Sequence, residues 1–399
     1  MLVSVILVAL SLPVVAWAAY PATLAILSRA LPPRSYDPTP KTKFDVIVPA
    51  HNEELGISST VTSLLGMDYP PHMRRIVVVA DNCTDATAAR AAEAGATVLE
   101  RFDALQRGKG YALAYAFERT LADGAADAVV VVDADTTVTK NLLAAFDARL
   151  RSGAAAVQAE YGVANRQASW RTRLMHIGFT LFHDVRSRAR EWLGASAGLR
   201  GNGMGFSTSV LRAVPHDAFS IVEDVEYGVR LGLAGYRVHY AGDATVFGEM
   251  AASEGAARSQ RDRWERGRWA LARRHARPLL LEGIRRRSLV LLDLAADLLV
   301  PPLTYVVLAA LAGVVASGVL VGVGRAAWWA LLPWSFALFA VALYVGRGVW
   351  LAKVGPRAIL DLLWAPAYML WKVGIAMRRS SAARGGKWVR TAREGEKVD

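Results

Sequence analysis

Long uninterrupted apolar runs lie at both ends of the chain, and the region between them alternates apolar and polar positions. Residues 3–28 carry no charge, and about 20 apolar residues suffice to cross a bilayer. The runs 298–322 and 326–344 are also long enough to span. Charged residues interrupt a fourth run, 358–377, for which we expect an interfacial or re-entrant segment rather than a third C-terminal span.

The central region alternates short β-branched runs with stretches of helical pattern. A strand buried on both faces of a parallel sheet has such a continuous apolar run. The alternation predicts an α/β fold, a mostly parallel, Rossmann-like sheet with helices on both faces. The predicted strands are 44–49, 75–80, 96–99, 128–133 and 154–160, and the predicted helices are 54–65, 86–94, 110–122, 141–151, 170–192, 221–233 and 257–275.

The composition indicates a membrane protein. Of the 399 residues, 53% are hydrophobic and only 21% are charged, which is too apolar for an ordinary soluble enzyme. The formal net charge is +12, and the basic clusters adjoin the apolar runs. That placement favours anionic lipid headgroups over a nucleic-acid surface. The single cysteine, Cys83, cannot form an intrachain disulfide.

The charges beside the first apolar run predict its orientation. Basic residues, Arg29 and Lys43 among them, follow the run, so the positive-inside rule places the central region in the cytosol. A signal peptide is the alternative, because residues 16–18 resemble a cleavage site. The start lacks a basic segment and the run is long for a signal peptide. The proline-rich stretch 31–43 is then a stiff linker to a multi-pass protein of the inner (plasma) membrane.

Polar side chains stand where the predicted strands end. Asp133 and Asp135 follow the valine-rich run, and one hard cation with its phosphates could bind both. Asp81 ends an earlier strand. A solvated turn or an Asx turn is the structural alternative at these acids. Lys109, between two glycines before a helix, could face a pyrophosphate or belong to flexible surface.

Two later stretches also carry candidate chemistry. Glu223 and Asp224 suit either catalysis or simply a helix N-terminus, where acids are favoured. Gln260, Arg263 and Trp264 share one helix face by their spacing, and the alternative is a basic amphipathic helix on the membrane. The sequence has no Cys/His set with zinc-site spacing.

These stretches together resemble the membrane-bound family-2 inverting glycosyltransferases, which include cellulose, chitin, hyaluronan and poly-N-acetylglucosamine synthases. The resemblance covers about residues 44–270, and it implies a cytosolic GT-A domain that binds a nucleotide sugar. The matching motifs, in the family's order, are VIVPAHNEE (46–54), VVVADNCTD (77–85), VVVVDADT (129–136), IVEDVE (221–226) and QRDRW (260–264).

The resemblance implies roles for the donor-binding residues. Pro49 borders the nucleoside, Glu53 contacts the ribose, and Asp81 reads the uracil edge. Asp135 binds Mg²⁺ or Mn²⁺ that bridges the diphosphate, and Asp133 supports both the sugar and the metal. The metal would neutralise charge on the departing diphosphate.

The resemblance also implies the reacting and acceptor residues. Asp224 is the general base, and we expect neighbouring acids such as Glu223 to raise its pKa. Arg263 binds phosphate, while Gln260 and Trp264 lie beside the acceptor, with Trp264 stacking under a sugar ring. The backbone at Gly203 is expected close to the acceptor sugar.

The sequence therefore predicts a transferase that moves a hexose or N-acetylhexosamine from a UDP-sugar to a polysaccharide or glycolipid acceptor. Alternatives are single transfer to a ceramide, hopanoid or polyprenyl lipid, and an inactive membrane carrier. A nicotinamide-dependent enzyme is excluded, because the turn after the first strand, 49–53, has an acid instead of a glycine-rich motif. The predicted units are 1–30 (span), 31–43 (linker), 44–256 (GT-A domain), 257–287 (interface helix), 288–377 (spans and interfacial helix) and 378–399 (basic cytosolic tail).

Overall fold

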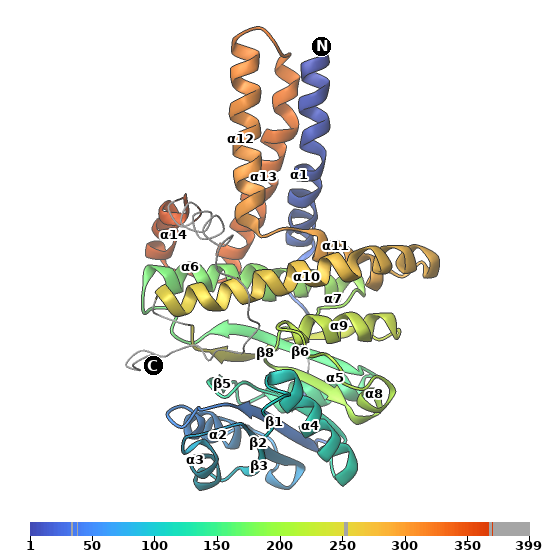
Figure 1. Ribbon diagram of the computed structural model, residues 1–399, viewed down its shortest axis with the longest axis vertical. Helices are drawn as coiled ribbons and strands as arrows, with labels where there is room; N and C mark the ends of the chain where they lie inside the picture. The colour runs from blue at the N-terminus through green and yellow to red at the C-terminus, as the bar shows by residue number, and fades with distance from the viewer. Residues whose placement is uncertain (33–34, 38, 251–253, 367–368, 370–399) are drawn as a thin grey trace.

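Three long apolar helices form a bundle that rises from the rest of the molecule (Figure 1). The computed structural model describes residues 1–32, 35–37, 39–250, 254–366 and 369, with the backbone alone for 254–263 and 358. Within these residues the candidate membrane spans are Leu2–Leu27, Leu303–Gly322 and Trp328–Leu351. They comprise α1 (Leu2–Leu27), α12 (Leu303–Gly322), the 3₁₀ turn η3 (Trp328–Leu331) and α13 (Leu332–Leu351).

The predicted spans are confirmed as apolar helices, with two changes of boundary: the second begins at Leu303, and the third continues to Leu351. The stretch before Leu303 forms a separate helix, because Pro301 and Pro302 interrupt the helical pattern. Small side chains let the bundle pack closely. A Cβ on Gly313 of α12 would lie only 2.0 Å from the Trp334 ring of α13, so the indole occupies the space that a side chain there would need.

The central region, which we expect in the cytosol, forms a mixed sheet. In the described residues this sheet has eight strands in the order β3-β2-β1-β4-β7-β6-β8-β5. The first four strands in this order run parallel, whereas β7 is antiparallel to both of its neighbours. The fold is that of a GT-A domain. The strands are β1 (Phe44–Ala50), β2 (Arg74–Asp81), β3 (Thr97–Arg101), β4 (Ala128–Val131), β5 (Thr136–Val138), β6 (Ala156–Val163), β7 (Met204–Ser207) and β8 (Val238–Gly248).

Helices cover both faces of this sheet, as the alternating pattern predicted (Figure 1). Along β1, Val46 and Val48 enter one core cluster while Ile47 enters the other. Successive side chains of a strand point to opposite faces, so a run that is apolar throughout needs cover on both sides. The helices of this domain are α2 (Ile57–Leu65), η1 (Pro71–Met73), α3 (Thr87–Glu93), α4 (Lys109–Asp123), α5 (Leu142–Arg151), α8 (Thr208–Ala213) and α9 (Glu223–Leu233).

A layer of helices crosses between the bundle and the sheet (Figure 1). The predicted helix 170–192 is confirmed as one continuous helical segment, with a π-helical turn at its centre. The layer consists of α6 (Trp170–Phe179), the π-helix η2 (Thr180–Val185), α7 (Arg186–Leu193), α10 (Glu254–Arg286) and α11 (Leu289–Leu299).

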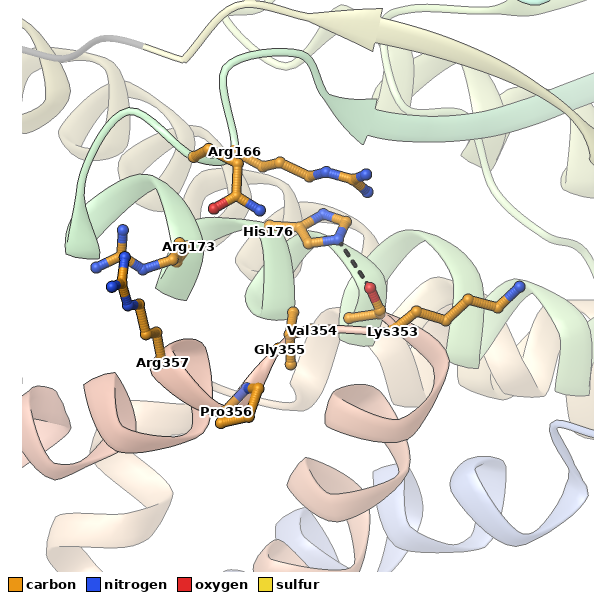
Figure 2. A pocket seen from close by; sticks show the side chains of 10 residues that line it. Arg166, Arg173, His176, Lys353, Val354, Gly355, Pro356 and Arg357 are labelled. Carbon is orange, nitrogen blue, oxygen red and sulfur yellow. Dashed lines mark hydrogen bonds between the residues drawn. The ribbon is translucent and has the colours of Figure 1, made fainter.

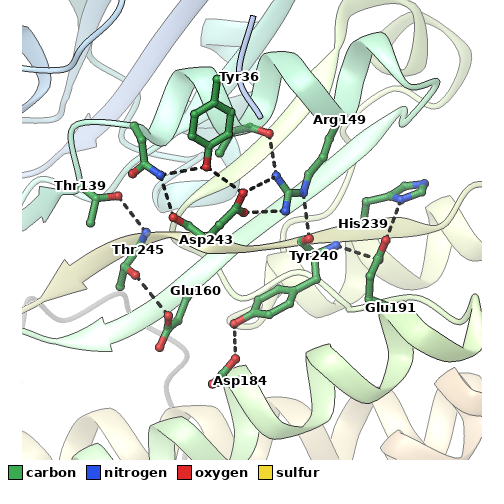
Figure 3. Close-up of polar contacts among 12 residues, drawn as sticks. Tyr36, Thr139, Arg149, Glu160, Asp184, Glu191, His239, Tyr240, Asp243 and Thr245 are labelled. Atoms are coloured by element: carbon green, nitrogen blue, oxygen red, sulfur yellow. Dashed lines mark hydrogen bonds and ion pairs between the residues drawn. The ribbon is translucent and has the colours of Figure 1, made fainter. Parts of the chain in front are cut away.

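Polar contacts tie the sheet to this layer (Figure 3). The Tyr240 hydroxyl donates to Asp184 of η2 at 2.8 Å, and the Tyr240 amide donates to Glu191 of α7 at 3.0 Å. On the other side of β8, the Arg149 guanidinium donates to the Tyr240 carbonyl and forms a 2.6 Å ion pair with Asp243. The strand β8 is thus fixed against the membrane-proximal helices.

The fourth apolar run is described only in its first part. It begins with α14 (Pro356–Asp361) and η4 (Leu362–Trp364), two short helices beside α6. Apart from residue 369, the remainder of the run beyond 366 and the predicted basic tail 378–399 lie outside the described residues. The interfacial placement of 358–377 therefore stays a prediction.

Candidate active site

Charged side chains from three elements meet at the carboxyl end of β4. Asp133 follows β4, Glu223 opens α9, and Lys109 opens α4. The Lys109 ammonium donates to Asp133 and, at 2.6 Å, to the Gly201 carbonyl, and it lies 4.0 Å from Glu223. Asp224 belongs to the same cluster, because its Oδ2 would lie 3.4 Å from a Cβ at Gly201. The predicted acids are therefore close neighbours.

A buried loop before β7 shapes the floor of this cluster. The Asn202 side chain is fully buried; it accepts from the Asp133 amide at 3.1 Å and donates to Thr136 at 2.7 Å. Gln158 of β6 in turn donates to the Asn202 carbonyl at 2.7 Å. These contacts hold the chain on either side of Ala134, at Asp133 and at Thr136. The loop that carries Asp133 and Asp135 is therefore fixed.

Burial determines the protonation of the acid pair. Desolvation raises the pKa of Glu223 to about 8, although the Lys109 charge opposes the shift. Desolvation also raises the pKa of Asp224, while hydrogen bonding to the Val225 amide and the Lys109 charge act against it. For Lys109, burial alone would lower the pKa, but Asp133 and Glu223 outweigh it and the pKa is raised. Burial thus favours the protonated form of both acids, and the Lys109 ammonium opposes it in both.

The predicted donor-binding residues lie at the ends of the neighbouring strands β1 and β2. Asp81 is buried and forms a 2.7 Å ion pair with Arg101, while His51 contacts the Asp81 carbonyl at 2.7 Å. Pro49 pairs with β2 in the register of the sheet. The Glu53 amide donates to a threonine hydroxyl at 2.7 Å. This edge is adjacent to β4, so a nucleoside here could place its diphosphate at the acid cluster.

The pair Asp133 and Asp135 has the donor chemistry for a hard divalent cation. Carboxylate oxygens are the ligands that Mg²⁺ and Mn²⁺ accept most readily. No group of three or more His, Cys, Asp or Glu side chains is arranged to hold a metal within the described ranges. In their donor chemistry the two aspartates fit part of the ligand set of such a cation, and the oxygens of a nucleotide diphosphate are of the same kind.

The predicted acceptor side is partly described. Trp264 of α10 is 39% exposed, and its ring centroid lies 6.5 Å from that of Phe179. Phe179 contacts Tyr161 at 5.3 Å. Burial, followed by the charges of Asp133 and Asp135, raises the pKa of Tyr161 well above its ordinary value, which places this tyrosine near the acids. An aromatic path thus runs from the acid cluster to Trp264.

Three of the predicted acceptor- and phosphate-side positions need comment. The backbone of α10 is helical at Gln260 and Arg263, but their side chains lie outside the described residues. The place of Gly203 beside the acceptor stays a prediction, and the structure gives a packing reason for a glycine there. Gly203 is buried with φ +66°, and a Cβ there would lie 2.8 Å from Val246, so packing demands the glycine. Gly201, two residues earlier, is the glycine that approaches the acids.

The sequence reasoning missed several residues around this cluster. Arg101, the partner of Asp81, lies in an unremarkable strand. Asn202 lies in a glycine-rich stretch, and no local sequence pattern indicated that it would form hydrogen bonds with the chain after β4. Lys109 was expected to face a pyrophosphate, yet here it neutralises Asp133. The pairing of β2 with β3 brings Arg101 to Asp81, and the pairing of β4 with β7 brings Asn202 to the chain that follows β4.

Comparisons with known proteins identify the family of the chain. Residues 40–267 match the sequence model described as "Glycosyltransferase like family 2". A β-monoglucosyldiacylglycerol synthase from Synechocystis is 30% identical over 56% of this chain and 47% of its own length. An N-acetylglucosaminyltransferase from Rhizobium leguminosarum is 26% identical over 59% of this chain and 58% of its own. The chain spans about half the length of these curated relatives.

One solved structure shares the architecture across almost the whole chain. The mannosyltransferase PcManGT from Pyrobaculum calidifontis, solved with GDP-Man and Mn²⁺, has a TM-score of 0.52. The alignment covers 94% of this chain and 95% of that one at 19% identity, so the likeness concerns the fold. It includes the long apolar helices as well as the sheet.

Proposed function

This chain belongs to glycosyltransferase family 2, and we propose that it transfers a hexose or N-acetylhexosamine from a UDP-sugar, with inversion, to a glycan or glycolipid at a membrane. The observation that carries the proposal is the cluster of Asp133, Glu223 and Asp224 around Lys109 at the end of β4. Ligands of open α/β sheets bind beyond the carboxyl ends of such strands. The family relatives include enzymes whose names specify glucosyl and N-acetylglucosaminyl transfer.

Asp224 is proposed as the general base. It takes the proton from the acceptor hydroxyl while that oxygen attacks the anomeric carbon, and the bond from this carbon to UDP breaks on the opposite face. The attack forms a β-linkage from an α-linked donor. The raised pKa of Asp224 makes its carboxylate a stronger base. It therefore accepts the proton of the attacking acceptor hydroxyl more readily.

Neighbouring residues would hold the donor. Asp133 and Asp135 are proposed to bind Mg²⁺ or Mn²⁺, which when bound supplies charge neutralisation for the leaving diphosphate. Lys109 donates a hydrogen bond to Asp133. With a metal bound to Asp133, the Lys109 ammonium would be available to contact the diphosphate of the donor. Pro49, Glu53 and Asp81 would border the nucleoside, with Arg263 on the phosphates.

The acceptor is proposed to reach the site from the membrane side, past Trp264 and Gln260 of α10. A β-linked polysaccharide is one acceptor class. Single transfer to a lipid is the second, and the number of spans favours it, because the described residues supply three candidate membrane helices and an aqueous polymer channel needs several around it. The basic residues after α1 support a multi-pass protein of the plasma membrane whose sheet domain faces the cytosol.

Nucleotide release by the purified full chain in lipid nanodiscs tests the proposal. The assay uses Mn²⁺ and a panel of UDP- and GDP-sugars, first alone and then with membrane lipid extract as the acceptor. We expect release with one UDP-hexose or UDP-N-acetylhexosamine, and sizing of the product separates a polymer from a singly glycosylated lipid. Folded protein that neither binds UDP nor releases nucleotide from any donor would refute the proposal.

A further inference from the structure

A cavity of about 460 Å³ lies where the chain leaves the third candidate span (Figure 2). One wall comes from the β6–α6 connection and α6, and the other comes from the turn between α13 and α14. Basic groups dominate the lining. They are Arg166, Arg173, His176, Lys353 and Arg357.

Two contacts between separate elements hold the walls in place. Arg173 of α6 forms an ion pair with Asp361 of α14. The Nε2 of His176 donates to the Ala352 carbonyl at 3.2 Å, which ties α6 to the end of α13. His176 is neutral, because burial lowers its pKa, and its buried Nδ1 has no hydrogen-bond partner among the described residues. The cavity is therefore a built feature of the helix layer.

The described carboxylates balance only part of the charge of this cavity. Arg173 has its own partner in Asp361, and the Lys353 charge acts on the Glu160 carboxylate, whose pKa burial raises and Lys353 lowers. Among the described residues no carboxylate lies within ion-pair distance of Arg166 or Arg357, and the excess of cations around the cavity creates a positive potential that attracts an anion. Guanidinium groups suit phosphate in particular, because they donate two parallel hydrogen bonds to it.

The position of the cavity indicates where such an anion comes from. α13 ends at Leu351, so residues 352–357 stand where the candidate span meets water. Phosphate groups of lipids are concentrated at this depth, and basic residues beside a span bind them. Residues 352–357 lie outside the stretch 40–267 that matches the family, whereas Arg166, Arg173 and His176 lie within it.

We propose that this cavity binds the phosphate headgroup of an anionic phospholipid in the leaflet where α13 ends. Arg166 and Arg357 hold the phosphate, and Lys353 adds a point charge. The site shares no lining residue with the acid cluster, so its occupation does not depend on the proposed transfer reaction. A bound lipid would connect α6 to the transmembrane bundle. α6 ends at Phe179, whose ring lies beside those of Tyr161 and Trp264.

The test measures the melting temperature of the full chain in neutral detergent while phosphatidylglycerol is added. Phosphatidylcholine and inorganic phosphate are added in parallel series. The variants are Arg166→Gln, Lys353→Gln, Arg357→Gln and their triple combination. Arg119→Gln, an exposed cation on α4 far from the bundle, is the matched control (Figure 1).

We expect phosphatidylglycerol to raise the melting temperature of the wild type and of Arg119→Gln, with saturation. Each single variant should need about fivefold more lipid for half of the shift, since a cation near an anionic surface contributes roughly that factor. The triple variant should lose the shift. An equal effect of phosphatidylcholine, an equal effect of inorganic phosphate, no shift in the wild type, or a full shift in the single variants would each overturn the proposal. The exposed single variants retain the fold contacts, so their result stands even if the triple variant is unstable.

Discussion

Replacing Asp297 by asparagine should destabilise the junction between the sheet domain and the helical bundle. Asp297 of α11 is buried and accepts from Arg186 and Arg190, each at 2.8 Å, and lies 3.6 Å from Arg268. Burial alone would raise the pKa of Asp297, but the three guanidiniums hold it well below its usual range. Asp293 is the second carboxylate of the cluster, at 2.8 Å from Arg190.

The magnitude follows from the charge that is left behind. Asparagine keeps the shape and one acceptor oxygen of Asp297, so the loss is electrostatic. Removing one partner of a buried ion pair costs about 3–5 kcal/mol, because the remaining charge stays buried without compensation. Asp217, which pairs with Arg230 at the surface and is 53% exposed in its side chain, provides the matched control. Asp217→Asn should cost less than about 1 kcal/mol.

The assay is unfolding of the full chain in a mild detergent, followed by tryptophan fluorescence. We expect Asp297→Asn to lower the melting temperature by roughly 6–20 °C and Asp217→Asn to leave it almost unchanged. Adding Arg268→Gln to Asp297→Asn should restore part of the loss, because one uncompensated cation is removed. Equal, small effects of Asp297→Asn and Asp217→Asn would refute the buried-charge argument, as would a further loss on adding Arg268→Gln.

Three further predictions concern the acid cluster and its floor. Burial raises the pKa of Asp224 and the Lys109 charge lowers it, so in Lys109→Met the acid limb of the kcat/KM profile, which reports the general base, should move to higher pH; an unchanged limb would argue against this coupling. Gly203→Ala should lower the free energy of unfolding by about 2–4 kcal/mol, because of the left-handed φ and the Val246 contact. Denaturant titration measures this loss, and an unchanged stability would contradict the argument. Chelation should abolish nucleotide release, and Asp135→Asn should need roughly 10- to 100-fold more Mn²⁺ for half-maximal rate, whereas an unchanged requirement would remove Asp135 from the metal site.

The parallel half of the sheet could be predicted because each strand is a continuous apolar run. The strands β1, β2 and β4 are buried on both faces, and their high valine and isoleucine content indicates this burial. The strands β7, which is antiparallel to both of its neighbours, and β8, which pairs parallel with β6, gave no such signal. Met204–Ser207 is short and contains a glycine, and Val238–Gly248 mixes polar and small residues, so only non-local pairing makes them strands.

The candidate site was predictable as a set of residues but not as an arrangement. The chain order of motifs brought Asp133 and Asp224 into one hypothesis, and the structure places both in one cluster. The cause of the raised pKa of Asp224 was predicted only in part. Neighbouring acids were expected to raise it, whereas burial is the largest cause. Burial depends on how α9 packs beside the β4–β7 pair, which local sequence does not specify.

The most direct test of the central claim separates turnover from donor binding in Asp224→Asn. UDP release and UDP affinity would be measured in the same nanodisc preparation, with Asp217→Asn alongside. Loss of a positioned general base predicts a fall in kcat of about 10²–10⁴-fold, with the dissociation constant for UDP nearly unchanged and Asp217→Asn close to wild type. Turnover by Asp224→Asn at the wild-type rate, or equal loss in both variants, would contradict the account.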